Sequence, residues 1–144
     1  MCQFASGFIN PKTFKVRVWD LDSHGETMEH LKLKDGNRPD GWREMHYLPD
    51  GDVSCQVLEI DRHSAKECEE AVRKRWPRFV DFFNWALPQT RGYTEGTYGG
   101  WLYLRGCDLK GVKLPQTVGG SLDLRGCTNT DKLDMSGVKG DVYC

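Results

Sequence analysis

The chain has 144 residues, and its 20 basic and 21 acidic side chains leave a formal net charge of -1. This length suits one compact domain, or one small domain with an appended array, and the balanced charge excludes a broad basic face for nucleic acid. No apolar run approaches the roughly 18 residues that a membrane span needs, and no signal-peptide profile opens the chain. We therefore expect a cytoplasmic protein that binds neither membranes nor nucleic acid directly.

The amino-terminal part of the chain predicts two pairs of strands around a short helix. Residues 2–9 are rich in Phe and Ile, and apolar side chains alternate with charged ones over 14–18, so these two segments predict a hairpin. A helical segment with a capping residue follows over 24–33. Residues 43–48 and 53–60 predict a second hairpin, because the Pro-Asp-Gly-Asp between them favours a turn. The expected order is ββαββ.

A longer helix is expected next. Ser64 and Glu67 have the spacing of a capping box, and Cys68, Val72 and Trp76 fall on one helix face. This face should pack on the sheet.

Pro77 either kinks that helix or opens a second one. Residues 79–87 are too apolar to remain in water as an isolated segment, so they must cover another part of the molecule.

The last third of the chain contains an internal repeat. Gly-Gly-Trp-Leu-Tyr-Leu-Arg-Gly-Cys at 99–107 returns at 119–127 as Gly-Gly-Ser-Leu-Asp-Leu-Arg-Gly-Cys, and a truncated third copy occupies 139–144. The alternating leucines predict a short strand in each copy, and the glycine density excludes a helix. One strand in each unit of about twenty residues predicts a short parallel β-solenoid.

The predicted fold class is therefore α+β. Residues 1–88 form a ββαββα(α) domain, 89–98 form a linker, and 99–144 form a solenoid of two and a partial repeat. Because an array of so few units cannot bury its apolar edges alone, the aromatic segment 79–87 should cap the first unit.

The other end of the array has no cap in the sequence and should present an open strand edge. We expect this edge to pair with a second copy or with another protein. Its residues are Lys139, Asp141, Val142, Tyr143 and Cys144.

Two resemblances accompany this pattern. Leu114-Pro115, Leu122-Asp-Leu124 and Gly126-Cys127 resemble the bacterial short form of the leucine-rich repeat, which implies a binding surface. The whole layout, which opens with Met-Cys-Gln-Phe-Ala-Ser and ends in the repeat, resembles small uncharacterised bacteriophage accessory proteins. That resemblance implies an anti-defence role of the anti-CRISPR type.

The two repeat arginines are the first candidate site. Arg105 and Arg125 occupy equivalent positions in adjacent units and should project on the same side, about 5 Å apart. Like charges this close repel unless a negative group lies between them. One interpretation pairs them with Asp108 or Asp123, and the other is a small site for a phosphate or for an acidic side chain of a partner.

Three aromatic side chains, those of Trp101, Tyr103 and Tyr143, are expected to project outward beside these arginines. Tyr, Trp and Arg are the residue types that dominate protein interfaces. A competing interpretation is that Trp101 packs against the linker. The predicted partner-binding surface consists of Trp101, Tyr103, Arg105, Asp123, Arg125 and Tyr143.

These features favour a non-enzymatic protein-binding factor without a cofactor or a metal, and the phage resemblance implies inhibition of a host defence component such as a CRISPR–Cas complex. The rival hypothesis is a protein that binds or sequesters a nucleotide or another anion, or a small enzyme, which would use the two arginines or Cys2. After removal of Met1, Cys2 would carry an amine beside its thiol, as in amino-terminal nucleophile hydrolases, although a structural thiol is the alternative.

Metal binding has weaker support in the sequence. His24, Glu26 and His30 could supply ligands from one helix, but the two histidines are six residues apart and do not face together. His46 and His63 could join them only if the fold brought them near. The Asp-Gly-Asp at 50–52 lacks the further oxygen ligands of a calcium loop, so we interpret it as a turn.

Overall fold

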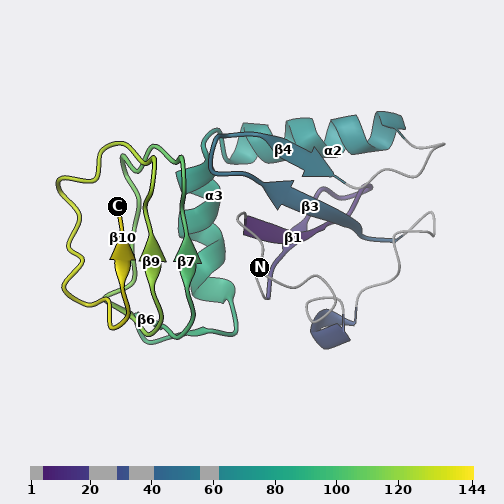
Figure 1. Cartoon of the computed structure of the whole chain (residues 1–144). Coiled ribbons are helices and arrows are strands. Elements are labelled where there is room, and N and C mark those ends of the chain that lie inside the picture. The colour runs from purple at the N-terminus through teal and green to yellow at the C-terminus, as the bar shows by residue number, and fades with distance from the viewer. Residues whose placement is uncertain (1–4, 20–28, 33–40, 56–61) are drawn as a thin grey trace.

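The computed structural model describes residues 5–19, 29–32, 41–55 and 62–144 (Figure 1). These residues form an α+β structure with one antiparallel sheet, two small further sheets, two α-helices and a short helical stretch at 29–31, and their sheets close no barrel. The α+β class is therefore confirmed. No helix within the described residues is long and apolar enough to cross a membrane.

The amino-terminal sheet is antiparallel and has the order β2-β1-β3-β4. Both expected hairpins are present, because β1 pairs with β2 and β3 pairs with β4. Gly51 lies in the second turn with φ +100, a conformation that favours glycine. The strands are β1 (Ala5–Ile9), β2 (Val16–Arg17), β3 (Arg43–Tyr47) and β4 (Val53–Cys55).

Parts of the expected elements lie outside the described residues. These parts are 2–4, the predicted helix over 24–28, and 56–60. Residues 29–31 are helical, and Lys32 already has φ +52, so the short helix ends before Leu33.

Helix α2 (Arg62–Arg75) packs against β4. It begins two residues before Ser64, so Ser64 lies in the first turn and the prediction of an N-cap there was wrong. The predicted buried face is confirmed, because Cys68, Val72 and Trp76 are all buried.

Pro77 ends this helical stretch, and a second helix, α3 (Phe79–Ala86), follows. The backbone N–H of Arg78 donates to the Asp81 carboxylate over 3.0 Å, which satisfies one donor at the start of α3. A short 3-10 helix, η1 (Leu87–Gln89), ends the segment. The buried side chains of α3 are Phe79, Val80, Phe82, Phe83 and Ala86.

The residues expected as a linker, 89–98, include two strands of their own. A two-residue turn with positive φ at Glu95 and Gly96 joins β5 (Tyr93–Thr94) to β6 (Thr97–Tyr98), the geometry that suits a tight hairpin. Strand β6 pairs in parallel with β8 (Thr117–Val118). Pairing between positions twenty residues apart therefore begins at Thr97, earlier than the Gly-Gly motif alone indicates.

The repeat motifs form a parallel sheet with the order β10-β9-β7. Leu102 lies opposite Leu122, and Leu122 lies opposite Val142. Isolated bridges join Asp108 to Thr128 and Val118 to Val138, so the same twenty-residue spacing recurs around the unit. The strands are β7 (Leu102–Tyr103), β9 (Leu122–Asp123) and β10 (Val142–Tyr143).

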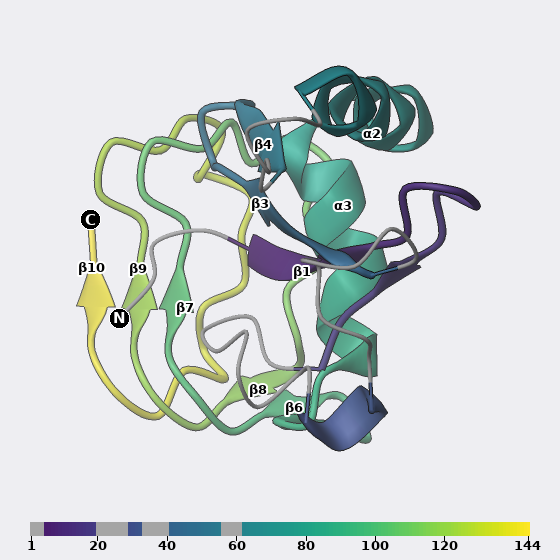
Figure 2. The ribbon, with the colours of Figure 1, turned by 90° about the vertical axis from the view of Figure 1, so that its right-hand side faces the viewer.

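Helix α3 joins the two parts of the molecule. Figure 1 shows it between the sheet β10-β9-β7 and the antiparallel sheet, and Figure 2 shows it against the antiparallel sheet. On one side its Phe82 ring stacks on Tyr47 of β3, with centroids 5.6 Å apart. On the other side Asn84 donates to the carbonyl of Gly111 over 2.9 Å and accepts from the N–H of Lys113 over 2.7 Å. The buried apolar side chains accordingly form one cluster that runs from Ala5 to Leu124.

Candidate partner-binding surface

The parallel sheet separates an apolar inner face from a polar and aromatic outer face. The inner leucines Leu102, Leu104, Leu122 and Leu124 are all buried. Alternate positions project to the opposite face because side chains along a strand point to the two faces in turn. The outer face therefore consists of short rows across the three strands.

One row places Asp123 between two tyrosines. Tyr103 lies opposite Asp123 on one side, and Tyr143 lies opposite it on the other. Asp123 is only 2% exposed even though it is charged and belongs to the outer face. A buried carboxylate needs compensating donors.

Arg125 supplies most of that compensation. Its Nε and Nη2 donate to the two carboxylate oxygens of Asp123 over 3.0 and 2.8 Å, and its backbone N–H donates to Oδ1 over 3.2 Å. Hydrogen bonds from Arg125 hold the pKa of Asp123 below its usual range, and the same contact raises the pKa of Arg125. Two donors in the plane of the guanidinium give this pair a defined geometry.

Arg105 shares the same carboxylate. Its Nε lies 3.9 Å from Oδ2 of Asp123. Of the two aspartates that the sequence left open, the arginines therefore pair with Asp123. Asp108 instead forms an ion pair with Arg78 at 3.4 Å and accepts a hydrogen bond from Asn129 at 2.6 Å.

Three aromatic rings continue this surface. The Trp101 ring stacks with Tyr103 at a centroid distance of 5.9 Å and with Tyr143 at 6.3 Å, with interplanar angles of 18° and 21°. The Arg125 guanidinium lies 5.6 Å from the centre of the Tyr143 ring. The six residues predicted for partner binding are thus brought together, and the indole bridges two strands that are not hydrogen-bonded to each other.

Ser121 is the member of this surface that sequence reasoning missed. It is 4% exposed, and its Oγ accepts the backbone N–H of Asp141 over 2.9 Å. A small residue at this position of the middle strand lets the Trp101 ring reach across toward Tyr143. The contrast between Trp101 and Ser121 at equivalent repeat positions is the signal that could have found it.

The backbones of neighbouring repeats approach one another closely at the glycines that precede each strand. Gly120 N–H donates to the carbonyl of Gly100 over 3.1 Å, and Gly140 N–H donates to Gly120 over 3.1 Å. A Cβ on Gly120 would lie 2.5 Å from Cδ1 of Trp101 and 2.7 Å from the Gly100 oxygen. Glycine at this position is therefore what allows the Trp101 ring to lie flat against the repeat.

The predicted edge residues lie on strand β10 and around it. Lys139, Asp141, Val142, Tyr143 and Cys144 are all exposed. Strand β10 pairs with β9, and no strand among the described residues pairs with its other side. The Leu122 and Leu124 N–H groups donate to the carbonyls of Asp141 and Tyr143.

The other candidate residues are not brought together into a site. Cys2, His24 and Glu26 lie outside the described residues, and the exposed His30 ring stacks on Trp19 at 3.7 Å. Asp52 pairs with Arg73 at 3.4 Å, and its N–H donates to Asp50, as expected for a turn. No cluster of metal-ligating side chains occurs within the described part of the chain.

Two buried thiols are poorly suited to nucleophilic chemistry. Burial raises the pKa of Cys55 and of Cys107 to about 12 in each case. The thiolate is the reactive form of cysteine, so neither residue is activated at neutral pH.

Comparison of the chain with protein-family models, with curated proteins and with solved structures finds no match.

Proposed function

We propose that this protein is a non-enzymatic binding factor that engages a protein partner through the outer face of the sheet β7-β9-β10. The observation that carries this proposal is the stack of Trp101, Tyr103 and Tyr143, because Trp101 and Tyr143 remain 43% and 37% exposed although they contact one another. Exposed aromatic rings that are already aligned lose little side-chain entropy on binding.

Charge complements this aromatic area. Arg105 and Arg125 share the Asp123 carboxylate, so this group of three side chains keeps one positive charge, while Asp141, which accepts from the Tyr143 hydroxyl at 3.4 Å, places a negative charge on the β10 side. Trp, Tyr and Arg are the residue types most enriched at binding hot spots. A partner that offers an apolar patch with an acidic side chain at its border would match this surface.

A small anion held between the two arginines has less support. The Asp123 carboxylate already lies where such an anion would bind, and Arg125 contacts it with two side-chain donors. An incoming phosphate would have to displace a buried and fully paired carboxylate.

For the architecture that presents the surface, we propose a short parallel solenoid, with each strand of β7, β9 and β10 belonging to one turn. The recurring twenty-residue register supports this interpretation. For the partner, we propose a bacterial defence component such as a CRISPR–Cas complex, on the strength of the resemblance to phage accessory proteins.

The test exchanges the aromatic rings while leaving the inner face intact. W101A/Y143A should weaken partner binding at least about thirtyfold, since truncation of even one hot-spot residue costs about 2 kcal/mol or more of binding free energy. F14A is the matched control, because Phe14 is an exposed aromatic residue, 38% accessible, outside this surface. In bacteria with an active CRISPR–Cas system, the wild type and F14A should restore plating of a targeted phage, whereas W101A/Y143A should not.

Two results would contradict the proposal. Equal partner binding by W101A/Y143A and by the wild type would remove the surface from the interface. Failure of the wild type to restore plating in any such strain would leave protein binding in place but reject a CRISPR–Cas complex as the partner.

We further propose that the β10 edge pairs with a strand from a second copy. Leu122 directs its N–H toward β10, and Val142 is the equivalent residue one repeat later, so its N–H should point away from β9. V142P removes this donor, while V142T keeps it together with the β-branched shape. Light scattering should show a dimer for the wild type and V142T and a monomer for V142P; a wild-type monomer at high concentration would refute the pairing.

A further inference from the structure

Strand β4 is an edge strand of the antiparallel sheet, and no described strand pairs with its outer side. The turn hydrogen bond from the Leu48 N–H to the Asp52 carbonyl sets which positions of β4 bond to β3, because such bonds alternate along an antiparallel pair. Ser54 therefore turns its backbone N–H and carbonyl toward β3, whereas Val53 and Cys55 turn theirs outward. Outward backbone groups of this kind are a template for pairing with another chain.

Two side chains of α2 occupy this outer edge. The Cys55 N–H donates to Oε1 of Glu69 over 3.2 Å, and Nη2 of Arg73 donates to the Val53 carbonyl over 3.4 Å. Glu69 and Arg73 are four residues apart, so they lie on one side of the helix, and Figure 1 shows α2 running beside β4. The helix thus supplies an acceptor and a donor where a fifth strand would supply a carbonyl and an N–H.

These two contacts are separate from the packing of the helix. Arg73 also forms an ion pair with Asp52 at 3.4 Å, and the two side chains of this pair are 46% and 63% exposed. The core contacts of α2 come instead from buried residues such as Cys68 and Val72. Ion pairs this exposed contribute little to stability, so Glu69 and Arg73 can be replaced while the helix stays packed on the sheet.

The two backbone groups that α2 engages are those that a second copy of β4 would need. If β4 of two copies paired antiparallel around a two-fold axis, with Ser54 opposite Ser54, each Cys55 N–H would donate to the Val53 carbonyl of the other copy. Ser54 is exposed and uncharged, so no like charges would face each other at the centre of this pair. The β4 edge is therefore complementary to itself once the two helix side chains are removed.

We propose that Glu69 and Arg73 close the β4 edge and thereby prevent it from pairing with β4 of a second copy. The closure limits the number of copies that assemble. A molecule with one open edge forms a closed pair, whereas a molecule with open edges at both β4 and β10 would extend into a chain of copies. The closure itself does not depend on the proposed function, because it concerns the sheet on the other side of α3.

Light scattering of variants that carry V142P tests the closure. V142P removes the β10 donor, so association in this background arises elsewhere, and the result is independent of whether β10 pairs. V142P alone should be a monomer. E69A/R73A/V142P at high concentration should show an about twofold higher molar mass, as expected for one two-fold pair.

Two control variants separate the hydrogen bonds at the edge from the charge of the helix. E70A/K74A/V142P removes the same two charges from neighbouring exposed positions of α2 and should remain a monomer. E69Q/R73K/V142P keeps an acceptor and a donor at the edge and should also remain a monomer.

Hydrogen exchange distinguishes pairing from unfolding. In dilute E69A/R73A/V142P the Cys55 amide should exchange at least about tenfold faster than in V142P, and high protein concentration should restore its protection. The Met45 amide in the neighbouring strand should be unchanged at both concentrations. If Met45 also loses protection, E69A/V142P replaces the larger variant, because it frees the Cys55 N–H and keeps Arg73; the same restoration of Cys55 protection is then expected.

Three outcomes would overturn the proposal. One is a monomer at every concentration for E69A/R73A/V142P with intact Met45 protection. Another is Cys55 exchange that does not depend on protein concentration in either variant that lacks Glu69. The third is equal association of E70A/K74A/V142P, which would assign the effect to charge. Failure of the β10 pairing, by contrast, would appear as a wild-type monomer and would leave these results unchanged.

Discussion

The antiparallel sheet β2-β1-β3-β4 and the parallel sheet β7-β9-β10 lie in one molecule but are stabilised differently. In the first, large side chains such as Phe8, Met45 and Tyr47 are fully buried, and α2 and α3 complete the core. In the second, strands of two residues pair at a constant spacing of twenty, and glycines let neighbouring backbones approach. Side-chain packing dominates one region, and repeated backbone pairing dominates the other.

This difference has a functional consequence. The inner leucines of the repeat supply its share of the core, so the outer positions need not contribute to it. Those positions can hold arginines and exposed rings, whereas comparable substitutions in β1 or β3 would disrupt packing. A binding surface on the repeat is therefore compatible with stability of the fold.

The strongest test of the comparison is a cavity in the shared core. F82A should lower the free energy of unfolding by about 3–5 kcal/mol, because the Phe82 ring is fully buried against Tyr47 and Trp76. If the two regions unfold together, hydrogen exchange should accelerate equally at the amides of Met45 and Leu122. F14A should change stability by less than about 0.5 kcal/mol, and unaltered exchange in β9 would show two independent units.

A smaller effect is expected from a methyl group between the repeat backbones. G120A should lower the free energy of unfolding by about 1–3 kcal/mol, because the added Cβ would overlap Trp101 and the Gly100 carbonyl. G99A is the matched control from the same motif, since a Cβ there meets nothing closer than 3.8 Å. Urea unfolding should separate the two variants, and equal stability would mean that close backbone approach does not hold the repeat together.

Removal of the buried Asp123 charge should lower the stability of the fold by less than the F82A cavity does. D123N should destabilise the fold by about 1–2 kcal/mol near neutral pH, since it leaves two guanidiniums without their shared carboxylate. The pKa of Asp123 is lowered in the folded state, so its contribution is present above the unfolded pKa and is lost as pH falls through the folded pKa. The stability difference between wild type and D123N should therefore begin to narrow below about pH 4 and vanish only below the lowered folded pKa of Asp123; a difference that does not shrink as the pH falls would reject the charge pairing.

The last prediction concerns reactivity and involves no change in stability. The cysteines of the repeat region differ in burial: Cys107 is buried and the equivalent Cys127 is half-buried, whereas Cys144, which aligns with Leu124 in the repeat, is exposed. Alkylation followed by peptide mapping should modify Cys144 first, then Cys127, and Cys107 last, together with Cys55 of the antiparallel sheet. The pKa of Cys107 is about 12, so its modification should stay slow at pH 8. Rapid labelling of Cys107 would show that the first repeat opens.

Several elements follow from local patterns alone. The face Cys68, Val72 and Trp76 was predictable from helical spacing, and the leucine alternation predicted which repeat residues are buried. Thr-Tyr-Gly-Gly at 97–100 also matches Thr-Val-Gly-Gly at 117–120, so the strand in the expected linker was visible in the sequence. Such patterns are short in range, and the periodicity of the backbone converts them directly into buried and exposed faces.

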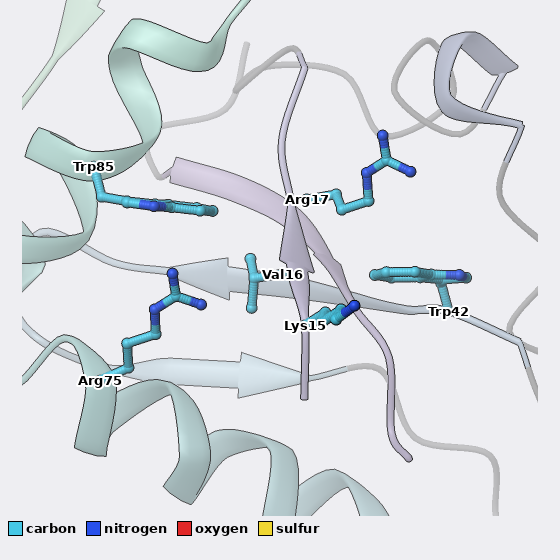
Figure 3. Close-up of a pocket in the computed structure, with 6 residues that line it drawn as sticks. All are labelled: Lys15, Val16, Arg17, Trp42, Arg75 and Trp85. Atoms are coloured by element: carbon cyan, nitrogen blue, oxygen red, sulfur yellow. The ribbon is translucent and has the colours of Figure 1, made fainter. Parts of the chain in front are cut away.

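The sequence by itself determined the repeat register, and with it the proximity of Tyr103, Asp123 and Tyr143 across neighbouring strands. Only the tertiary structure decided that Asp123, rather than Asp108, neutralises the arginines, because that choice depends on where Arg78 and Asn129 lie. The pocket drawn in Figure 3 likewise has lining residues from three elements, namely Arg17 of β2, Arg75 of α2 and Trp85 of α3. Spacing along the chain specifies neighbours within an element, whereas contacts between elements depend on how their side chains share the available space.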